Sequence, residues 1–364
     1  KNMPEQVYLD SAATTQKHTC VVEMVTQYQA CSNATVHRSA YAIANQATKD
    51  YESARASVAA LVHVENSSEI VFTSGATESI NMIAAGIVPS MLSGSKILLM
   101  TSEHHANILP WQALSKRLGL NIECVELSED GQFHQAQYEQ LLKQMDKDVA
   151  IMAIAHVSNA LGNIYPVNAL FKRANEDNIL TIIDGTQAVA HMPVNLEQMG
   201  CDFYVFSGHK MYAPTGTGVL FGKLSHLEAL NPQKLGGEMI TAVSLTDATF
   251  QSPPLKFEGG TPNISGVLGL GAAAKFLKDN MQAIQIHEKQ LFSSLIEGLQ
   301  KREGIRLLGN LLSDNSEFPT QSQDESKLLG LSIGLQSLVF LKHNVNDVAQ
   351  YMYKQNIAVR VGHH

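Results

Sequence analysis

The chain has few cysteines, and their spacing excludes two classes of protein. There are four in 364 residues: Cys20, Cys31, Cys124 and Cys201. No two of them form a C-x-x-C pair, which argues against a zinc site and against a disulfide framework. Widely spaced cysteines in a chain of this length are typical of reduced, mostly buried thiols. We therefore expect a cytoplasmic protein without a metal centre.

Long apolar runs and basic clusters are also missing. No stretch approaches the roughly 20 apolar residues that span a bilayer, so we expect no membrane segment. The formal net charge of −8 and the lack of a basic run argue against a nucleic-acid partner. Residues 1–5 have no apolar signal-peptide core, and because the chain does not begin with Met we expect residues to be missing or removed before Lys1.

What the chain does contain is a repeated alternation of apolar runs and amphipathic stretches. With 45% hydrophobic and 16% charged residues it is globular, and its length suits one large and one smaller domain. Continuous apolar runs predict strands buried on both faces. They lie at 70–73, 96–100, 149–154, 179–184, 203–206 and 218–221, with helical patterns from Thr77, at 106–118 and at 169–178. The sequence thus predicts an α/β fold with an open, mainly parallel sheet that binds ligands at its carboxyl edge.

The pattern changes after a Pro- and Gly-rich stretch at 253–266. A long helical pattern follows at 267–301, and the remainder is more mixed. We therefore predict a large α/β domain over 15–275. A small α+β domain is predicted from 1–14 and 276–364, and we expect its C-terminal part to be incomplete.

Two of the predicted strands end in single ionisable groups, Asp184 and Lys210. Parallel strands place an amine and a carboxylate on the same edge of the sheet. Pyridoxal phosphate (PLP) requires this pair: the amine reacts with its aldehyde, and the carboxylate keeps its pyridine nitrogen protonated. Desolvation at a strand end also lowers the pKa of a lysine. Alternatively, Lys210 reaches out to solvent and Asp184 is an ordinary helix cap.

An anion site is predicted where the first of these strands meets its helix. Residues 73–78 (TSGATE) form a Gly-containing turn in which the backbone N–H groups near Ala76 and the hydroxyl of Thr77 face outward. Ser207 and His209, beside Lys210, are further candidate phosphate donors. Each of these features is also common in helix caps and turns.

Two side chains complete the predicted cofactor site. His104 follows the 96–100 strand and offers a flat ring to stack on an aromatic cofactor. The adjacent His105 raises the possibility of a metal, but neighbouring side chains diverge and no H-E-x-x-H spacing follows. Gln187 lies three residues after Asp184, where its amide could reach the phenolic oxygen of PLP. Anion site, imidazole, carboxylate and lysine occur in this order on successive strands, and together they predict a PLP enzyme.

Several short strings resemble those of cysteine desulfurases, which belong to the class V aminotransferase group of PLP enzymes. The strings are 8–14 (YLDSAAT), 77–81 (TESIN), 103–107 (EHHAN), 156–159 (HVSN), 184–187 (DGTQ), 207–210 (SGHK) and 260–263 (GTPN). They occur in order, and the resemblance covers 7–364. Residues 36–39 (VHRS) and 360–364 (RVGHH) favour the group II branch, closest to the cysteine sulfinate desulfinase subtype. The resemblance implies the type I fold of PLP-dependent transferases.

The resemblance also implies roles at matching positions. Lys210 would hold PLP covalently and move protons at the substrate α-carbon, while His104 would stack on the ring. Asp184 would pair with the pyridine nitrogen and Gln187 with the ring oxygen. The remaining roles would be these: Asn159 near the ring; Ala76, Thr77, Ser207 and His209 at the phosphate; Thr261 at the phosphate of the second subunit in a homodimer; His37 and Arg360 in the substrate pocket.

One part of the family pattern is missing. In the family, a cysteine thiolate directly after the His-His pair takes the sulfur, but this chain stops at His364. None of its four cysteines occupies the matching position, and the later arginine that binds the substrate carboxylate is absent too. We expect a chain that is cut, or disordered, just before its nucleophile. A natural deletion, or a tag remnant at His363 and His364, is the alternative.

The function implied is removal of sulfur, sulfite or selenium from cysteine, cysteine sulfinate or selenocysteine to give alanine. The sulfur would pass to an acceptor protein for iron–sulfur cluster assembly or other sulfur metabolism. A selenocysteine lyase or a related aminotransferase of the same fold is the nearest alternative. A non-catalytic PLP-binding partner of a sulfur carrier is a third, but a scaffold has no need of Lys210, His104 and Asp184.

Overall fold

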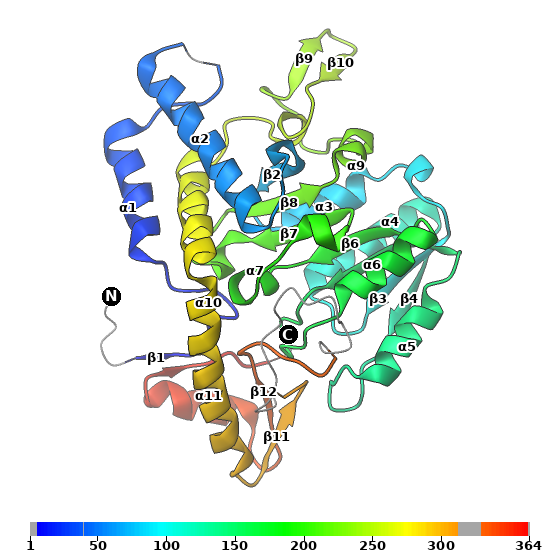
Figure 1. Cartoon of the computed structure of the whole chain (residues 1–364), viewed down its shortest axis with the longest axis vertical. Coiled ribbons are helices and arrows are strands. Elements are labelled where there is room, and N and C mark those ends of the chain that lie inside the picture. The colour runs from blue at the N-terminus through cyan, green and yellow to red at the C-terminus, as the bar shows by residue number, and fades with distance from the viewer. Residues whose placement is uncertain (1–5, 39, 312–328, 363–364) are drawn as a thin grey trace.

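Seven strands form one twisted sheet at the centre of the large part of the molecule (Figure 1). The computed structural model describes residues 6–38, 40–311 and 329–362. The strand order is β2-β8-β7-β6-β5-β3-β4, and β8 runs antiparallel to both of its neighbours. The strands are β2 (Ile70–Thr73), β3 (Lys96–Met100), β4 (Asn121–Val125), β5 (Val149–Ala155), β6 (Leu180–Asp184), β7 (Phe203–Ser207) and β8 (Gly218–Gly222). The predicted mainly parallel α/β sheet is confirmed.

Helices cover both faces of this sheet, as the apolar runs predicted. Alternate residues of β3 belong to different cores: Ile97 and Leu99 to one, Leu98 and Met100 to the other. The first core includes residues of α3 (Ala76–Gly86), α4 (Leu109–Leu118) and α9 (Leu224–Ala229). The second includes residues of α2 (Ala42–Leu61), α6 (Val167–Glu176), α7 (Ala188–His191), α8 (Leu196–Met199) and α10 (Ile264–Gln300). Burial on both faces explains why the strands lack polar alternation.

A smaller group of elements lies around the C-terminal half of α10 (Figure 1). There β1 (Val7–Tyr8) pairs in parallel with β13 (Ile357–Ala358), and β11 (Ile305–Leu308) pairs with β12 (Ser337–Phe340). The remaining elements are α1 (Thr19–Gln27), α5 (Gln135–Gln144), α11 (Val345–Lys354) and the projecting hairpin of β9 (Ile240–Val243) and β10 (Ala248–Phe250). The long helix predicted at 267–301 is therefore present as α10. The division at residue 275 falls within α10 and stays a prediction.

The described part of the chain contains no helix with the length and apolar character needed to cross a bilayer. The expectation of mostly buried cysteines is wrong for two of the four. Cys201 is buried and Cys20 half-buried, whereas Cys31 and Cys124 are exposed. Cys124 lies on β4, the edge strand of the sheet, in which only Val125 is buried.

Candidate active site

Asp184 and Lys210 lie at the carboxyl ends of neighbouring parallel strands. Asp184 is the last residue of β6, and Lys210 ends a short 3-10 turn, Gly208–Lys210, that follows β7. Burial lowers the pKa of Lys210, the charge of Asp184 opposes this shift, and Arg360 adds to it. A lysine in this setting carries a neutral, nucleophilic amine over a wider pH range than one in water.

Two buried side chains, Tyr204 and His156, pack next to Asp184 and Gly185. The Tyr204 hydroxyl and Nδ1 of His156 lie 2.9 Å apart, and the His156 backbone N–H donates to the Asp184 carbonyl at 2.9 Å. Burial lowers the pKa of His156 to about 4, so this ring is neutral at pH 7. The Tyr204 ring packs so closely under Gly185 that a Cβ at position 185 would lie 2.0 Å from it. The Asp184 carboxylate is 9% exposed and accepts the Thr186 N–H at 3.0 Å.

The loop after β3 brings His104 to the same edge. Partial burial lowers the pKa of His104; Asp184 opposes this and Lys210 adds to it. Because Nδ1 of His104 accepts the Ala106 N–H at 3.1 Å, the neutral ring carries its proton on Nε2. Lys210, Asp184 and His104 thus act on one another electrostatically, as the predicted site requires.

A buried carboxyl group, that of Glu103, anchors this loop, and sequence reasoning gave it no role. Glu103 accepts the Ala155 backbone N–H at 2.9 Å and an Asn107 amide N–H at 2.7 Å. The Trp111 indole N–H in turn donates to Asn107 at 2.9 Å. Burial raises the pKa of Glu103 to about 8. Since Ala155 is the register partner of Asp184, Glu103 fixes the His104 loop directly to the strand beside that carboxylate.

The turn between β2 and α3 lies against the end of β7. The Ala76 backbone N–H donates to Oγ of Ser207 at 2.9 Å, and Thr77 is exposed in the first turn of α3. The approach of β8 requires a glycine, because a Cβ at Gly218 would lie 2.4 Å from Cα of Gly75. First-turn N–H groups of a helix have no partner within the helix and attract anions. The predicted phosphate turn therefore has suitable geometry.

An N-terminal segment closes one side of the site and was not predicted. The His209 carbonyl accepts hydrogen bonds from the Lys17 ammonium at 3.0 Å and from the Thr15 N–H at 3.0 Å. The Gln187 amide donates to the Ala12 carbonyl at 2.9 Å. Only the recognised string 8–14 pointed to this segment; the polar residues 15–17 carry no periodic signal.

The other predicted residues are more scattered. Arg360 forms an ion pair with Asp10 at 3.2 Å and is near enough to affect Lys210, whereas Asn159 lies in the turn after β5. His37 contacts α2, and Thr261 is exposed before α10. Within the described ranges, no hydrogen bond or ion pair joins either of these two to Lys210 or Asp184. His363, His364 and Ser39 lie outside the described residues.

The described residues include no group of three His, Cys, Asp or Glu side chains arranged to hold a metal ion. His104 and His105 have ring centroids 6.0 Å apart and are tilted by 59°. The site therefore offers an amine, a carboxylate, an imidazole and an anion-binding turn. This donor set suits a phosphorylated aldehyde cofactor and not a metal ion.

Comparison with known proteins places the chain in a family. The family described as "Aminotransferase class-V" matches residues 7–364. A protein named "probable cysteine desulfurase" from Halalkalibacterium halodurans is 39% identical over 360 residues, which cover 98% of this chain and 83% of the relative. A cysteine desulfurase from Yersinia pseudotuberculosis is 35% identical over 361 residues, covering 98% and 84%.

Solved structures of cysteine desulfurases resemble this chain as well. The cysteine desulfurase of Thermococcus onnurineus superposes with a TM-score of 0.87 at 33% identity, covering 99% of this chain and 85% of that one. The cysteine desulfurase CsdA of Escherichia coli gives a TM-score of 0.84, with the same identity and coverage. The predicted type I fold of PLP-dependent transferases is thereby confirmed. The chain belongs to the class V aminotransferase family.

Proposed function

We propose that the chain is a PLP-dependent cysteine desulfurase. The observation that carries the proposal is the placement of Lys210 and Asp184 at the ends of adjacent parallel strands, close enough to His104 for both charges to affect its pKa. The names of its relatives support the activity. The electrostatic setting supports the reaction class, because a desolvated amine attacks carbonyls and moves protons.

The residues present fit PLP. We assign Lys210 to the aldehyde, Asp184 to the pyridine nitrogen and His104 to the ring face. Gln187 is assigned to the ring oxygen with Asn159 nearby, and Ala76, Thr77, Ser207 and His209 to the phosphate. When bound, PLP supplies an electron-accepting ring that weakens bonds at the substrate α-carbon. The Lys210 amine would then move the α-proton, and the Nε2–H group of His104 would donate a hydrogen bond at the ring face.

The site is completed, in this proposal, by a second copy of the chain. Thr261 is exposed, and among the described residues no hydrogen bond or ion pair joins it to the phosphate turn of its own copy. Gly260 has φ +84°, which turns the chain sharply before Thr261. A homodimer in which Thr261 reaches the partner's phosphate gives this hydroxyl a role. Arg360, beside Lys210, is assigned to the substrate pocket with His37.

The sulfur-accepting thiol is proposed to follow His364. Burial raises the pKa of Cys20, of Cys124 and of Cys201, so these thiols stay protonated and are poor nucleophiles. We propose cysteine as substrate, with cysteine sulfinate and selenocysteine as analogues, and the sulfinate desulfinase subtype as closest. The sulfur would go to an acceptor protein for iron–sulfur assembly, in the cytoplasm.

The first test concerns the cofactor. Protein loaded with PLP and reduced with borohydride should carry the adduct on Lys210, located by mass spectrometry of peptides. Lys210→Arg, which keeps the charge, serves as the control and should carry none. An adduct on another lysine would overturn the assignment.

The second test concerns the reaction. The chain ending at His364 should bind cysteine but accumulate no persulfide, whereas a chain extended by its encoded residues should release alanine and leave a persulfide. Cysteine sulfinate should turn over slowly in both, because sulfite leaves without a nucleophile. Full desulfuration by the short chain would place the nucleophile elsewhere. Products from selenocysteine alone would favour the lyase.

A further inference from the structure

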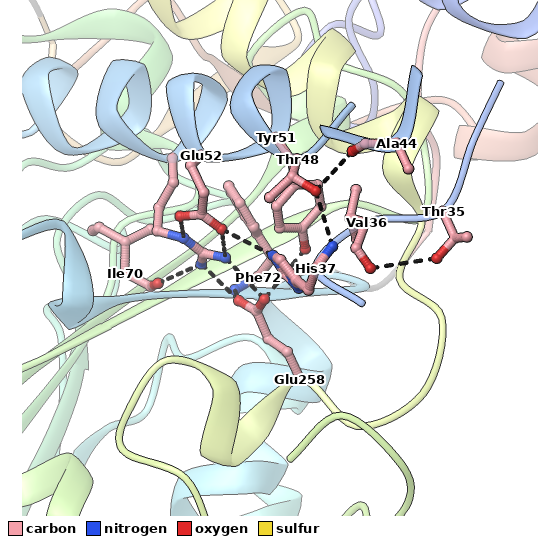
Figure 2. A network of polar contacts seen from close by, with 11 residues as sticks. Thr35, Val36, His37, Ala44, Thr48, Tyr51, Glu52, Ile70, Phe72 and Glu258 are labelled. Atoms are coloured by element: carbon pink, nitrogen blue, oxygen red, sulfur yellow. Dashed lines mark hydrogen bonds and ion pairs between the residues drawn. The ribbon is translucent and has the colours of Figure 1, made fainter. Parts of the chain in front are cut away.

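A buried arginine on α2 lies at the centre of a polar cluster (Figure 2). The Arg55 side chain is 1% exposed, and its two terminal nitrogens bind the carboxylate of Glu258 at 2.7 and 2.9 Å. Its Nε binds Glu52, one turn earlier on α2, at 2.9 Å. Glu258 is itself 5% exposed. Arg55 therefore binds two carboxylates, and one of them, that of Glu258, is almost completely buried.

The Glu258 side of the cluster fixes two segments that lead to the proposed phosphate site. The Phe72 backbone N–H donates to Glu258 at 2.8 Å, and Arg55 donates to the Ile70 carbonyl at 2.8 Å. Both contacts are to β2, which runs into the turn at Ala76. Glu258 also stands three residues before Thr261. One carboxylate thus sets the end of β2 and the loop 259–262 relative to each other.

The Glu52 side fixes the turn that carries His37. Nε2 of His37 lies 3.3 Å from Glu52, and its backbone N–H donates to Oγ1 of Thr48 at 2.9 Å. His37 has φ +72°, a conformation that is unfavourable for residues with a Cβ and that needs such support. Figure 2 shows Thr48 and Glu52 on the same side of α2, both directed at this turn.

A second set of contacts joins the two sides. Arg38, next to His37, pairs with Glu238 at 2.9 Å, and the Gly260 N–H donates to the Gly237 carbonyl at 2.9 Å. The His37 turn, the loop 259–262 and the loop around 238 are therefore linked to one another as well as to Arg55. A shift of one segment strains the others.

Stability alone does not require such a cluster. Replacing a buried ion pair with well-packed apolar residues is often neutral or stabilising, so its use here points to geometry. We propose that Arg55, with Glu258 and Glu52, is a positioning centre that sets the phosphate-binding loop through one carboxylate and the substrate-side turn through the other. The inference rests on the proposed function and adds residues that touch neither cofactor nor substrate.

The experiment measures the effects of the two carboxylates, those of Glu258 and Glu52, independently. Glu258→Gln keeps the shape of the side chain but removes its charge. This variant should bind PLP about tenfold more weakly, as expected for one lost hydrogen bond to a charged group. Absorbance of the bound cofactor would measure the affinity. Glu52→Ala should leave PLP affinity within about twofold while weakening cysteine binding to the loaded protein several-fold, on the order of one lost polar contact. Glu52→Gln, which keeps an acceptor for His37, should restore part of the cysteine affinity.

The matched control is Glu176→Ala, which breaks the exposed i,i+3 pair with Arg173 on α6 and should change neither affinity. Equal loss of both affinities in Glu52→Ala, or no loss in Glu258→Gln, would overturn the inference. Should Glu258→Gln not fold, as judged by circular dichroism, the two Glu52 variants decide alone. Failure of the wild-type protein to bind PLP would instead refute the proposed function.

Discussion

The ammonium group of Lys17 donates a hydrogen bond to the backbone carbonyl of His209, the residue directly before Lys210, at 3.0 Å. Its other acceptor is the Thr15 carbonyl at 2.9 Å. The positive charge of Lys17 therefore rests against the lysine-bearing turn. After burial and Lys210, it is a further cause of the lowered pKa of His209.

Lys17→Met should raise the pKa of His209, because it removes a positive charge that disfavours protonation of the ring. Histidine NMR titration would measure this, with the signal assigned by its loss in His209→Gln. Lys147→Met, at an exposed position before β5 on the opposite edge of the sheet, is the control and should leave the pKa unchanged. An unaltered His209 titration in Lys17→Met would show that the contact is too well screened to matter.

The buried amine of Lys210 should make the cofactor-free protein more stable as pH rises. Its folded pKa lies below the ordinary 10.5, so the unfolded chain binds more protons between the two values and unfolding becomes less favourable with increasing pH. Urea unfolding from pH 7 to 10 would compare the wild type with Lys210→Met, which lacks the buried amine. The difference between their free energies of unfolding should shrink as pH rises. A difference that is constant with pH would contradict the lowered pKa.

Glu103 should have the opposite effect on stability. Its folded pKa of about 8 lies above the ordinary 4.5, so the folded protein binds the extra proton. Stability that is fully present below pH 4.5 is then lost as pH rises toward 8, by at most about 1.4 kcal/mol per pH unit for one proton. Glu103→Gln should flatten this slope. An unchanged slope, measured by urea unfolding between pH 5 and 8, would mean that Glu103 is ionised in the folded protein.

Gly185→Ala should be strongly destabilising, because its Cβ would overlap the Tyr204 ring. Forced rearrangement in a packed core typically costs about 1–3 kcal/mol. Thermal unfolding would measure it. Gly298→Ala, on α10 with nothing within 4 Å of the new Cβ, is the control and should stabilise by up to about 1 kcal/mol through helix propensity. Equal midpoints for the two variants would contradict the close packing under Asp184.

Thr261→Val should weaken PLP retention by about 1–2 kcal/mol, the size of one hydrogen bond to a charged group, while Thr261→Ser should not. A heterodimer formed by mixing two variant chains provides a sharper test of whether Thr261 serves the partner's site. A heterodimer of Thr261→Val and Lys210→Ala chains should contain one intact site and bind one PLP normally, if Thr261 serves the partner. Normal retention by a Thr261→Val homodimer, or by a monomer, would rule out a shared site.

The placement of Asp184 and Lys210 was predictable because it depends on local sequence. Asp184 and Lys210 follow apolar runs directly, so their place at the sheet edge follows from strand direction alone. Glu103 and Lys17 could not be assigned in this way, since the contacts that tie them to the site are to backbone groups of Ala155 and His209, which are distant in sequence. Arg55 and Glu258 are 203 residues apart, and neither lies in a periodic pattern that singles it out.

The elements missed in the sequence share weak hydrophobic signals. On α2 the buried face relies on small residues such as Ala44, Ala47 and Ala54, which resemble the solvent-facing alanines of any helix. The strand β4 lies at the edge, where only Val125 is buried. The other strands of the central sheet are buried on both faces and therefore have continuous apolar sequences that predict them. The strand β4 is not buried in this way, so its sequence carries no such signal.

The pairing of β1 with β13 has a consequence for the order of events during synthesis. Asp10 and Arg360, which meet beside these strands, are 350 residues apart. A ribosome therefore releases every strand of the central sheet before the partner of β1 exists. Until Ile357 and Ala358 have been synthesised, β1 lacks the strand with which it pairs. The ion pair between Arg360 and Asp10 can therefore form only after every strand of the central sheet has been synthesised.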